Sequence, residues 1–174
     1  MRVIAGEFRS RRLKTLPGLA LRPTPDRLRE ALFSVLAPRI EGATFLDAYA
    51  GSGAVGIEAL SRGAARAIFV EKHFGAVSVV RENLASLGLE DRATVVHSAT
   101  VPALRRFNAD IYFLDPPYTA ITEYESALSL LGDRPALVLA QHTKRLELAE
   151  AYGNLRRTRV LAQGDNAISF YVVS

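Results

Sequence analysis

The pattern of hydrophobic and polar residues indicates a repeated strand–helix alternation over most of the chain. Short apolar runs cover residues 44–48, 67–70, 93–97, 111–114 and 136–140, and helical spacing is found near 54–62, 74–87, 100–106 and 123–131. Central strands of a parallel sheet are buried on both faces, so they read as continuous apolar runs. The pattern therefore predicts an α/β fold with a doubly wound, mostly parallel sheet.

The C-terminal end departs from this alternation. Residues 155–161 and 167–173 read as two strands, separated by Gly164, Asp165 and Asn166. Two strands joined by so short a turn pair with each other in antiparallel fashion. We therefore expect a C-terminal antiparallel hairpin that completes a seven-stranded sheet.

The N-terminal end also has a pattern of its own. Residues 2–14 alternate loosely around Gly6, which predicts an N-terminal β-hairpin. A helix should follow, with Thr24 as its N-cap, Pro25 as its first residue and Pro38 at its end. We expect two units: an N-terminal extension over residues 1–40 and a main domain over residues 41–174.

Composition narrows the class of protein. Hydrophobic residues make up 49% and charged residues 23% of the 174-residue chain, as in an ordinary globular protein. Cysteine is absent and the three histidines stand far apart, so we expect no disulfide, no thiolate nucleophile and no metal site. No apolar stretch reaches the length of a membrane span and no signal peptide is recognisable. A soluble cytoplasmic protein without membrane association is expected.

The positive charge of the chain is concentrated at its N-terminus. The net charge is +4, and the first 30 residues hold eight basic against three acidic side chains. Clustered basic side chains favour a polyanionic partner, because they displace counterions from phosphates. We expect RNA contacts from Arg9, Arg11, Arg12 and Lys14. The alternative is a solvated surface hairpin in an arginine-rich protein.

A glycine motif follows the first predicted strand. Gly51, Ser52, Gly53 and Gly56 form a G-x-G-x-x-G pattern between a strand and a helix. Glycines at this place let the backbone approach a ligand and let the helix pack close to the strand. Glu71 ends the second strand, where a carboxylate can accept hydrogen bonds from two ribose hydroxyls. The motif predicts an adenosine-containing cofactor; the alternative is a tight turn with a surface glutamate.

Two observations favour S-adenosylmethionine over a nicotinamide cofactor. A dehydrogenase usually needs a further catalytic domain, and little more than 100 residues follow the glycines. Asp47 lies at the strand tip four residues before Gly51, where a carboxylate suits the ammonium group of an amino acid and would repel a pyrophosphate. We therefore predict S-adenosylmethionine as the cofactor.

A second motif follows the fourth predicted strand and consists of Asp115, Pro116, Pro117 and Tyr118. Two consecutive prolines stiffen the loop and remove two N–H donors. The Asp115 carboxylate and the Pro116 carbonyl then offer two acceptors for the hydrogens of an exocyclic amino group. Tyr118 offers a flat face on which an extruded base can stack. The structural alternative is a proline turn that ends a strand.

Together with these motifs, nearly the whole chain resembles the RsmD family, which consists of bacterial methyltransferases that modify guanine N2 in small-subunit (16S) ribosomal RNA. The Asp115–Tyr118 loop is similar to the D/N-P-P-Y/F motif of amino-methyltransferases in general. The N-terminal segment Arg22-Pro23-Thr24 is more specific to this family. The matching stretches are residues 2–6, 11–13, 22–24, 26–30, 47–56, 58–64 and 115–118, together with the closing strands.

The resemblance implies a class I, Rossmann-like methyltransferase sheet, S-adenosylmethionine as methyl donor and one 16S rRNA guanine as acceptor, in the small subunit or an assembly intermediate. Separately from the resemblance, we expect a monomer without a bound metal. By position, the resemblance also implies roles for individual site residues. The methionine end of the cofactor would be held by Asp47, Gly51, Ser52 and Gly53, and its ribose by Glu71. The target base would be held by Asp115, Pro116 and Tyr118. The cofactor carboxylate would be reached by Arg22 and Thr24, or these two would fix the segment above it.

One position departs from the family pattern. Ala99 stands after the third strand, where such enzymes often place Asp or Asn to bind the adenine amino group. Ser98 or a backbone carbonyl would have to substitute for that side chain. Three alternative functions stay open: an adenine-N6 or DNA amino-methyltransferase of the same fold, a catalytically idle RNA-binding module in ribosome assembly, and a nicotinamide enzyme.

Overall fold

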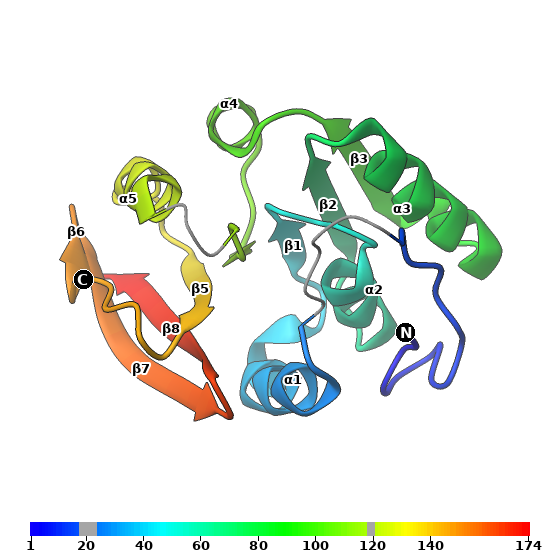
Figure 1. The fold of residues 1–174 in the computed structure, drawn as a ribbon, viewed down its shortest axis with the longest axis horizontal. Helices are drawn as coiled ribbons and strands as arrows, with labels where there is room; N and C mark the ends of the chain where they lie inside the picture. The colour runs from blue at the N-terminus through cyan, green and yellow to red at the C-terminus, as the bar shows by residue number, and fades with distance from the viewer. Residues whose placement is uncertain (18–23, 118–120) are drawn as a thin grey trace.

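The centre of the molecule is a single sheet of eight strands. The computed structural model describes residues 1–17, 24–117 and 121–174, and their strands follow the order β3-β2-β1-β4-β5-β8-β7-β6 (Figure 1). The strands are β1 (Thr44–Asp47), β2 (Arg66–Glu71), β3 (Ala93–His97), β4 (Ile111–Leu114), β5 (Leu137–Thr143), β6 (Ala151–Tyr152), β7 (Leu155–Gln163) and β8 (Asn166–Val173).

The pairing confirms the predicted doubly wound sheet with its C-terminal hairpin. Strands β1 to β5 pair in parallel, while β8 is antiparallel to β5 and β7. The two-residue strand β6 is an eighth strand that the sequence did not predict, since it is too short to show a period. The strand order reverses between β1 and β4, which makes this the point where such sheets bind ligands.

Helices cover both faces of the sheet. They are α1 (Asp26–Ile40), α2 (Ala54–Ser61), α3 (Phe74–Leu87), the short 3₁₀ helix η1 (Glu90–Arg92), α4 (Thr100–Arg106) and α5 (Ile121–Leu130). Buried residues of α1, α2 and α3 form one hydrophobic cluster with the sheet, and those of α4 and α5 form a second cluster (Figure 1). None of the helices in the described ranges is long and apolar enough to cross a membrane.

Alternation along the strands explains the two clusters. Phe45 and Phe113 belong to the first cluster, whereas their chain neighbours Leu46 and Tyr112 belong to the second. Successive side chains of a strand point to opposite faces, so a strand covered on both sides needs apolar residues at every position.

Helix α1 differs from the prediction at both ends. Pro25, and not Thr24, is the N-cap, and the Thr24 hydroxyl donates a hydrogen bond to Gln141 Oε1 at 3.0 Å in place of capping the helix. Pro38 lies inside the helix, which continues to Ile40. Ile40 is buried in the first cluster, and this packing stabilises a last turn that proline would otherwise disfavour.

The N-terminal segment folds back on itself in antiparallel fashion, as predicted, but its pairing is too short to make two regular strands. Its β-pairing is an isolated bridge between Arg2 and Arg12. The backbone amides of Ile4 and Ala5 donate instead to the two carboxylate oxygens of Glu58 in α2, at 2.9 and 3.0 Å. Three backbone hydrogen bonds still join the two arms of the segment, from Val3 N to the Arg11 carbonyl, from Ser10 N to the Val3 carbonyl and from Leu13 N to the Met1 carbonyl, each at 2.9 Å. The bonds to α2 dock this short hairpin-like pairing onto the main domain.

Two fully buried charged residues hold this segment in place. Glu58 also accepts a hydrogen bond from Arg62 Nε at 2.8 Å, and Arg29 donates to the Arg2 carbonyl at 2.7 Å. Val3 and Leu13 join the same hydrophobic cluster as α1. Residues of the segment therefore belong to the main hydrophobic core. The division of the chain into two units at residue 40 stays a prediction.

Gly6 permits this close docking, and its replacement should be costly. Gly6 has a φ of +88°, and an added Cβ would lie 2.0 Å from the Ser61 carbonyl oxygen. Gly42 has a similar φ of +76° but nothing within 4 Å of its added Cβ. Gly42→Ala should lower the free energy of unfolding by about 1–2 kcal/mol through backbone strain alone. Gly6→Ala should cost about 1–3 kcal/mol more, because the contact forces the segment outward.

Denaturant unfolding of both glycine variants measures these losses. Equal losses would show that the contact with Ser61 does not limit how the segment docks.

Candidate active site

A cavity of about 420 Å³ opens at the carboxyl ends of β1, β2 and β4, at the point where the strand order reverses. Its size is typical of small-molecule sites. Seven of the predicted site residues are among those that line it: Thr24, Asp47, Gly51, Ser52, Glu71, Asp115 and Pro116.

The glycine loop connects β1 to α2 at the floor of this cavity. Gly53 is the N-cap of α2 and, like Gly51, has a positive φ. A Cβ added to Gly56 would lie 2.3 Å from a ring carbon of Phe69 in β2. Glycine at this position therefore lets α2 pack directly against the sheet, as the motif predicts. Gly51 and Ser52 line the cavity, whereas Gly53 is not among the lining residues.

Glu71 is buried at the end of β2 and is held by two loop amides. Its Oε1 accepts a hydrogen bond from Gly51 N at 3.0 Å, and its Oε2 accepts one from His73 N at 2.8 Å. Each carboxylate oxygen can accept a further bond. The side chain is thus fixed at the cavity wall with acceptor capacity left for a ligand hydroxyl.

Asp47 is buried at the end of β1 and has one oxygen without a partner. Gly56 N donates to its Oδ2 at 3.3 Å, while Oδ1 has no hydrogen bond within the described residues. Burial raises the pKa of this carboxyl to about 7. Hydrogen bonds from backbone N–H groups lower the pKa in part, and the negative charge of Glu71 raises it slightly. A cationic ligand group beside Oδ1 would supply the missing partner.

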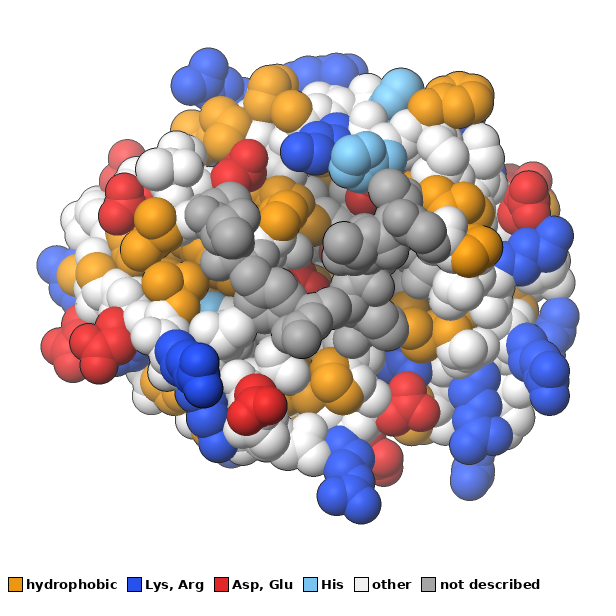
Figure 2. Space-filling model, in the orientation of Figure 1, with side chains coloured by type: hydrophobic (Ala, Val, Ile, Leu, Met, Phe, Trp, Pro, Cys, Tyr) orange, Lys and Arg blue, Asp and Glu red, His pale blue; other side chains and the backbone are white. Residues whose placement is uncertain are grey.

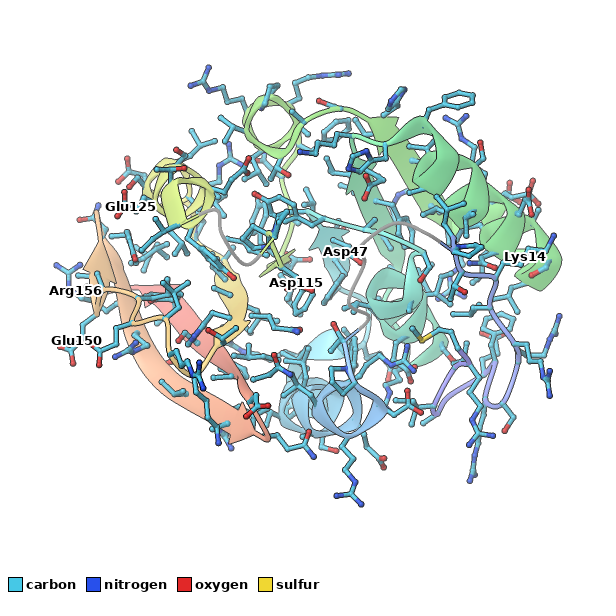
Figure 3. All side chains as sticks on the ribbon, viewed as in Figure 1. Lys14, Asp47, Asp115, Glu125, Glu150 and Arg156 are labelled. Atoms are coloured by element: carbon cyan, nitrogen blue, oxygen red, sulfur yellow. The ribbon has the colours of Figure 1, made fainter. Side chains whose placement is uncertain are left out.

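Asp115 directly follows β4 on the same cavity wall. Figure 3 shows its side chain next to Asp47, since β1 and β4 are paired neighbours. Desolvation, followed by the charge of Asp47, raises the pKa of Asp115 to about 8. Two acids with raised pKa values in one cavity are typical of a functional site.

Several cavity residues were not predicted from the sequence. Tyr49 lies between Asp47 and the glycines, and its hydroxyl donates to Glu123 Oε2 at 2.6 Å. Thr100, at the start of α4, donates to the Ala48 carbonyl at 2.8 Å. The chain ahead of α1 also contributes Met1, Thr15, Leu16 and Pro17, and the loop after β2 contributes Lys72 and His73. Tyr49 could have been found from its place inside the motif, whereas the N-terminal wall depends on long-range docking.

The other residues predicted to bind the cofactor either do not line the cavity or lie outside the described residues. Ser98 and Ala99 are not among the lining residues; the Ser98 hydroxyl bonds to the Ala99 carbonyl at 2.8 Å, and Ala99 is exposed. The predictions for Arg22 and Tyr118 fall outside the described residues.

The predicted RNA-binding side chains lie on the docked N-terminal segment, and all are exposed. Lys14 forms an ion pair with Glu82 at 2.7 Å, and Arg11 donates to the Ser86 carbonyl at 2.9 Å. Arg9 and Arg12 have no side-chain partner within the described part of the chain. These two arginines are therefore the more available for phosphate.

The cavity residues fit S-adenosylmethionine. The unpaired Oδ1 of Asp47 suits the ammonium group of its amino acid, and the fixed Glu71 suits ribose hydroxyls. Apolar side chains such as Val55 and Val70 line the same cavity and suit the uncharged parts of the cofactor.

The sheet, its strand order and the cavity at the switch point define a class I methyltransferase fold. An RNA methyltransferase from Salinibacter ruber, solved in complex with S-adenosyl-L-homocysteine, shares this fold with a TM-score of 0.70 at 15% identity, over 87% of this chain and 94% of that one. The solved structure of yhhF from Escherichia coli gives a TM-score of 0.84 at 36% identity, over 100% and 98% of the two chains.

The chain belongs to the RsmD family: the family model described as "Conserved hypothetical protein 95" matches residues 1–172. The Escherichia coli (strain K12) protein named "Ribosomal RNA small subunit methyltransferase D" is 43% identical over 135 residues, which cover 76% of this chain and 67% of that protein.

Proposed function

We propose that this protein transfers a methyl group from S-adenosylmethionine to the exocyclic N2 of a guanine in 16S ribosomal RNA. The observation that carries the proposal is the pair of carboxylates, Asp47 and Asp115, on one wall of the cavity at the β1/β4 switch point. One suits the cationic amino acid of the cofactor and the other suits the amino group of a base.

The two carboxylates have separate roles in this proposal. Ionised Asp47 holds the ammonium group through Oδ1, and Glu71 holds the ribose. Once ionised, the Asp115 carboxylate accepts one hydrogen of the guanine amino group and the Pro116 carbonyl accepts the other, which turns the nitrogen lone pair toward the methyl group. Bound S-adenosylmethionine would supply that methyl group from its sulfonium centre and leave as S-adenosylhomocysteine, and the Asp115 carboxylate would take up the proton that N2 loses. Positioning of this kind supplies most of the catalysis that such a transfer needs.

Ribosomal RNA as substrate is supported by the printed name of the 43% identical Escherichia coli relative. The guanine, the N2 atom and the ribosomal context are our extension from the family resemblance. We further propose that the enzyme acts as a monomer in the cytoplasm, on RNA within the small subunit or an assembly intermediate.

Methyl transfer from labelled S-adenosylmethionine tests the proposal. Unmodified small-subunit rRNA, 30S particles and duplex DNA serve as acceptors, and the products are digested to nucleosides. We expect label in N2-methylguanosine from RNA. Label in adenine or in DNA alone would overturn the acceptor, and cofactor binding without any transfer would favour an RNA-binding module.

Neutralising two exposed arginines should weaken RNA binding in a salt-dependent way. Each phosphate contact contributes about 0.7–0.9 to the slope of log affinity against log salt. Arg9→Gln with Arg12→Gln should therefore reduce the magnitude of that slope by about 1 to 2. Arg66→Gln, at the amino end of β2, is the matched control. An unaltered slope in the double variant would assign Arg9 and Arg12 to the protein surface alone.

A further inference from the structure

An exposed pair of aromatic rings lies just outside the cavity. Phe74, the first residue of α3, is 70% exposed, although large apolar side chains of the described residues are mostly buried. Its ring centroid is 5.9 Å from that of His97, which ends β3, and the two planes are inclined by 58°. We call Phe74 and His97 the aromatic shelf.

The shelf is held at the rim of the cavity. His97 Nε2 lies 3.0 Å from the Lys72 carbonyl oxygen, which fixes the imidazole beside the loop after β2. Lys72 and His73 of that loop line the cavity, whereas neither Phe74 nor His97 is among the lining residues. A molecule that enters the cavity and extends past Lys72 therefore meets the shelf.

The surroundings of the shelf favour an anionic partner. Lys72 and His73 are exposed, and Figure 2 shows histidine side chains near the top of this face, with a basic side chain next to one and a hydrophobic side chain near another. Helix α3 begins here with no acidic residue in its first turn and no side-chain cap, and the nearby Glu71 carboxylate accepts a hydrogen bond from the backbone N of its N-cap residue, His73. The neighbouring Glu71 is buried, with its oxygens already bonded to Gly51 N and His73 N.

We propose that the aromatic shelf binds a nucleotide flanking the target base, with the flanking base stacked on Phe74 and its phosphate beside Lys72. Aromatic faces bind bases of single-stranded RNA regardless of sequence, and basic side chains next to them bind the backbone. This inference rests on the proposed function, because it extends the same RNA from the cavity across its rim. It adds a contact surface separate from Arg9 and Arg12 on the N-terminal segment.

Substitution of Phe74 tests the shelf. Phe74→Ala should weaken binding of unmodified 16S rRNA by about 5- to 100-fold, the range of one lost base stack. Phe74→Trp should restore the affinity, because it keeps a stacking face. Val160→Ala is the matched control, since Val160 is also exposed but lies on β7. The salt slope should stay the same in Phe74→Ala, since stacking releases no counterions.

The measurements are the RNA affinity, the S-adenosylmethionine affinity and the thermal unfolding of each variant. Unchanged RNA affinity in Phe74→Ala would overturn the shelf. A weaker cofactor affinity with unchanged RNA affinity would assign Phe74 to the cofactor site instead. RNA binding that depends on Phe74 without any methyl transfer would sustain the shelf and overturn the proposed reaction, while a wild-type chain that binds no RNA would overturn both.

Discussion

Asp115→Ala should lower the rate of methyl transfer by at least 10²- to 10³-fold, the loss typical of a single group that stabilises the reacting atoms. Asp115 lies on the cavity wall at the end of β4, where its carboxylate can accept a hydrogen from the amino group of the base. Without it the amino group loses its orientation. Cofactor affinity should stay close to wild type, because Asp47 and Glu71 are untouched.

Single-turnover transfer and cofactor binding by calorimetry separate these two effects. Asp165→Ala, in the exposed turn between β7 and β8, is a matched control that removes a carboxylate far from the cavity. Unchanged turnover in Asp115→Ala would remove this loop from the proposed chemistry. Loss of cofactor affinity equal to the loss of rate would give Asp115 a role in binding only.

Asp47→Asn should weaken S-adenosylmethionine binding by about 10- to 100-fold, the range for a lost hydrogen bond to a charged group. The substitution keeps the shape of the side chain but removes the charge that faces the ammonium group. The fold should not suffer, because the carboxylate that is replaced is buried with Oδ1 unpaired in the described structure.

The same residue predicts a pH dependence. Its pKa is about 7 in the folded protein and 3.8 as the ordinary value, so the empty folded protein retains a proton that the unfolded chain has released. The free energy of unfolding should therefore fall as pH rises from about 4 through 7, and Asp115, with a pKa of about 8, acts in the same direction. Cofactor affinity should rise over the same window as Asp47 ionises.

Binding and unfolding at pH 5.5 and pH 8.5 check both trends. Asp47→Asn should bind the cofactor with little dependence on pH, since the titrating group is gone. A wild-type affinity that is flat between these values would show that Asp47 is already ionised in the empty cavity.

The strands and helices of the main sheet could be read from the chain because each depends on local periodicity. The run at 111–114 became β4 with the same bounds, and the stretch at 74–87 became α3. Helix α1 was less predictable at its ends. The Thr24 hydroxyl bonds to Gln141, which is 117 residues away, and no local capping rule contains that partner.

The fold class, the glycine loop and three site candidates, Asp47, Glu71 and Asp115, could be predicted from the residues alone, because they follow from the hydrophobic period and from motifs at strand ends. Two features became visible only in the folded chain: the N-terminal segment forms a wall of the cavity, and Phe74 lies against His97 at the rim of the cavity. The amides of Ile4 and Ala5 reach Glu58 across more than 50 residues. Contacts of that range depend on how the layers pack, which no local pattern encodes.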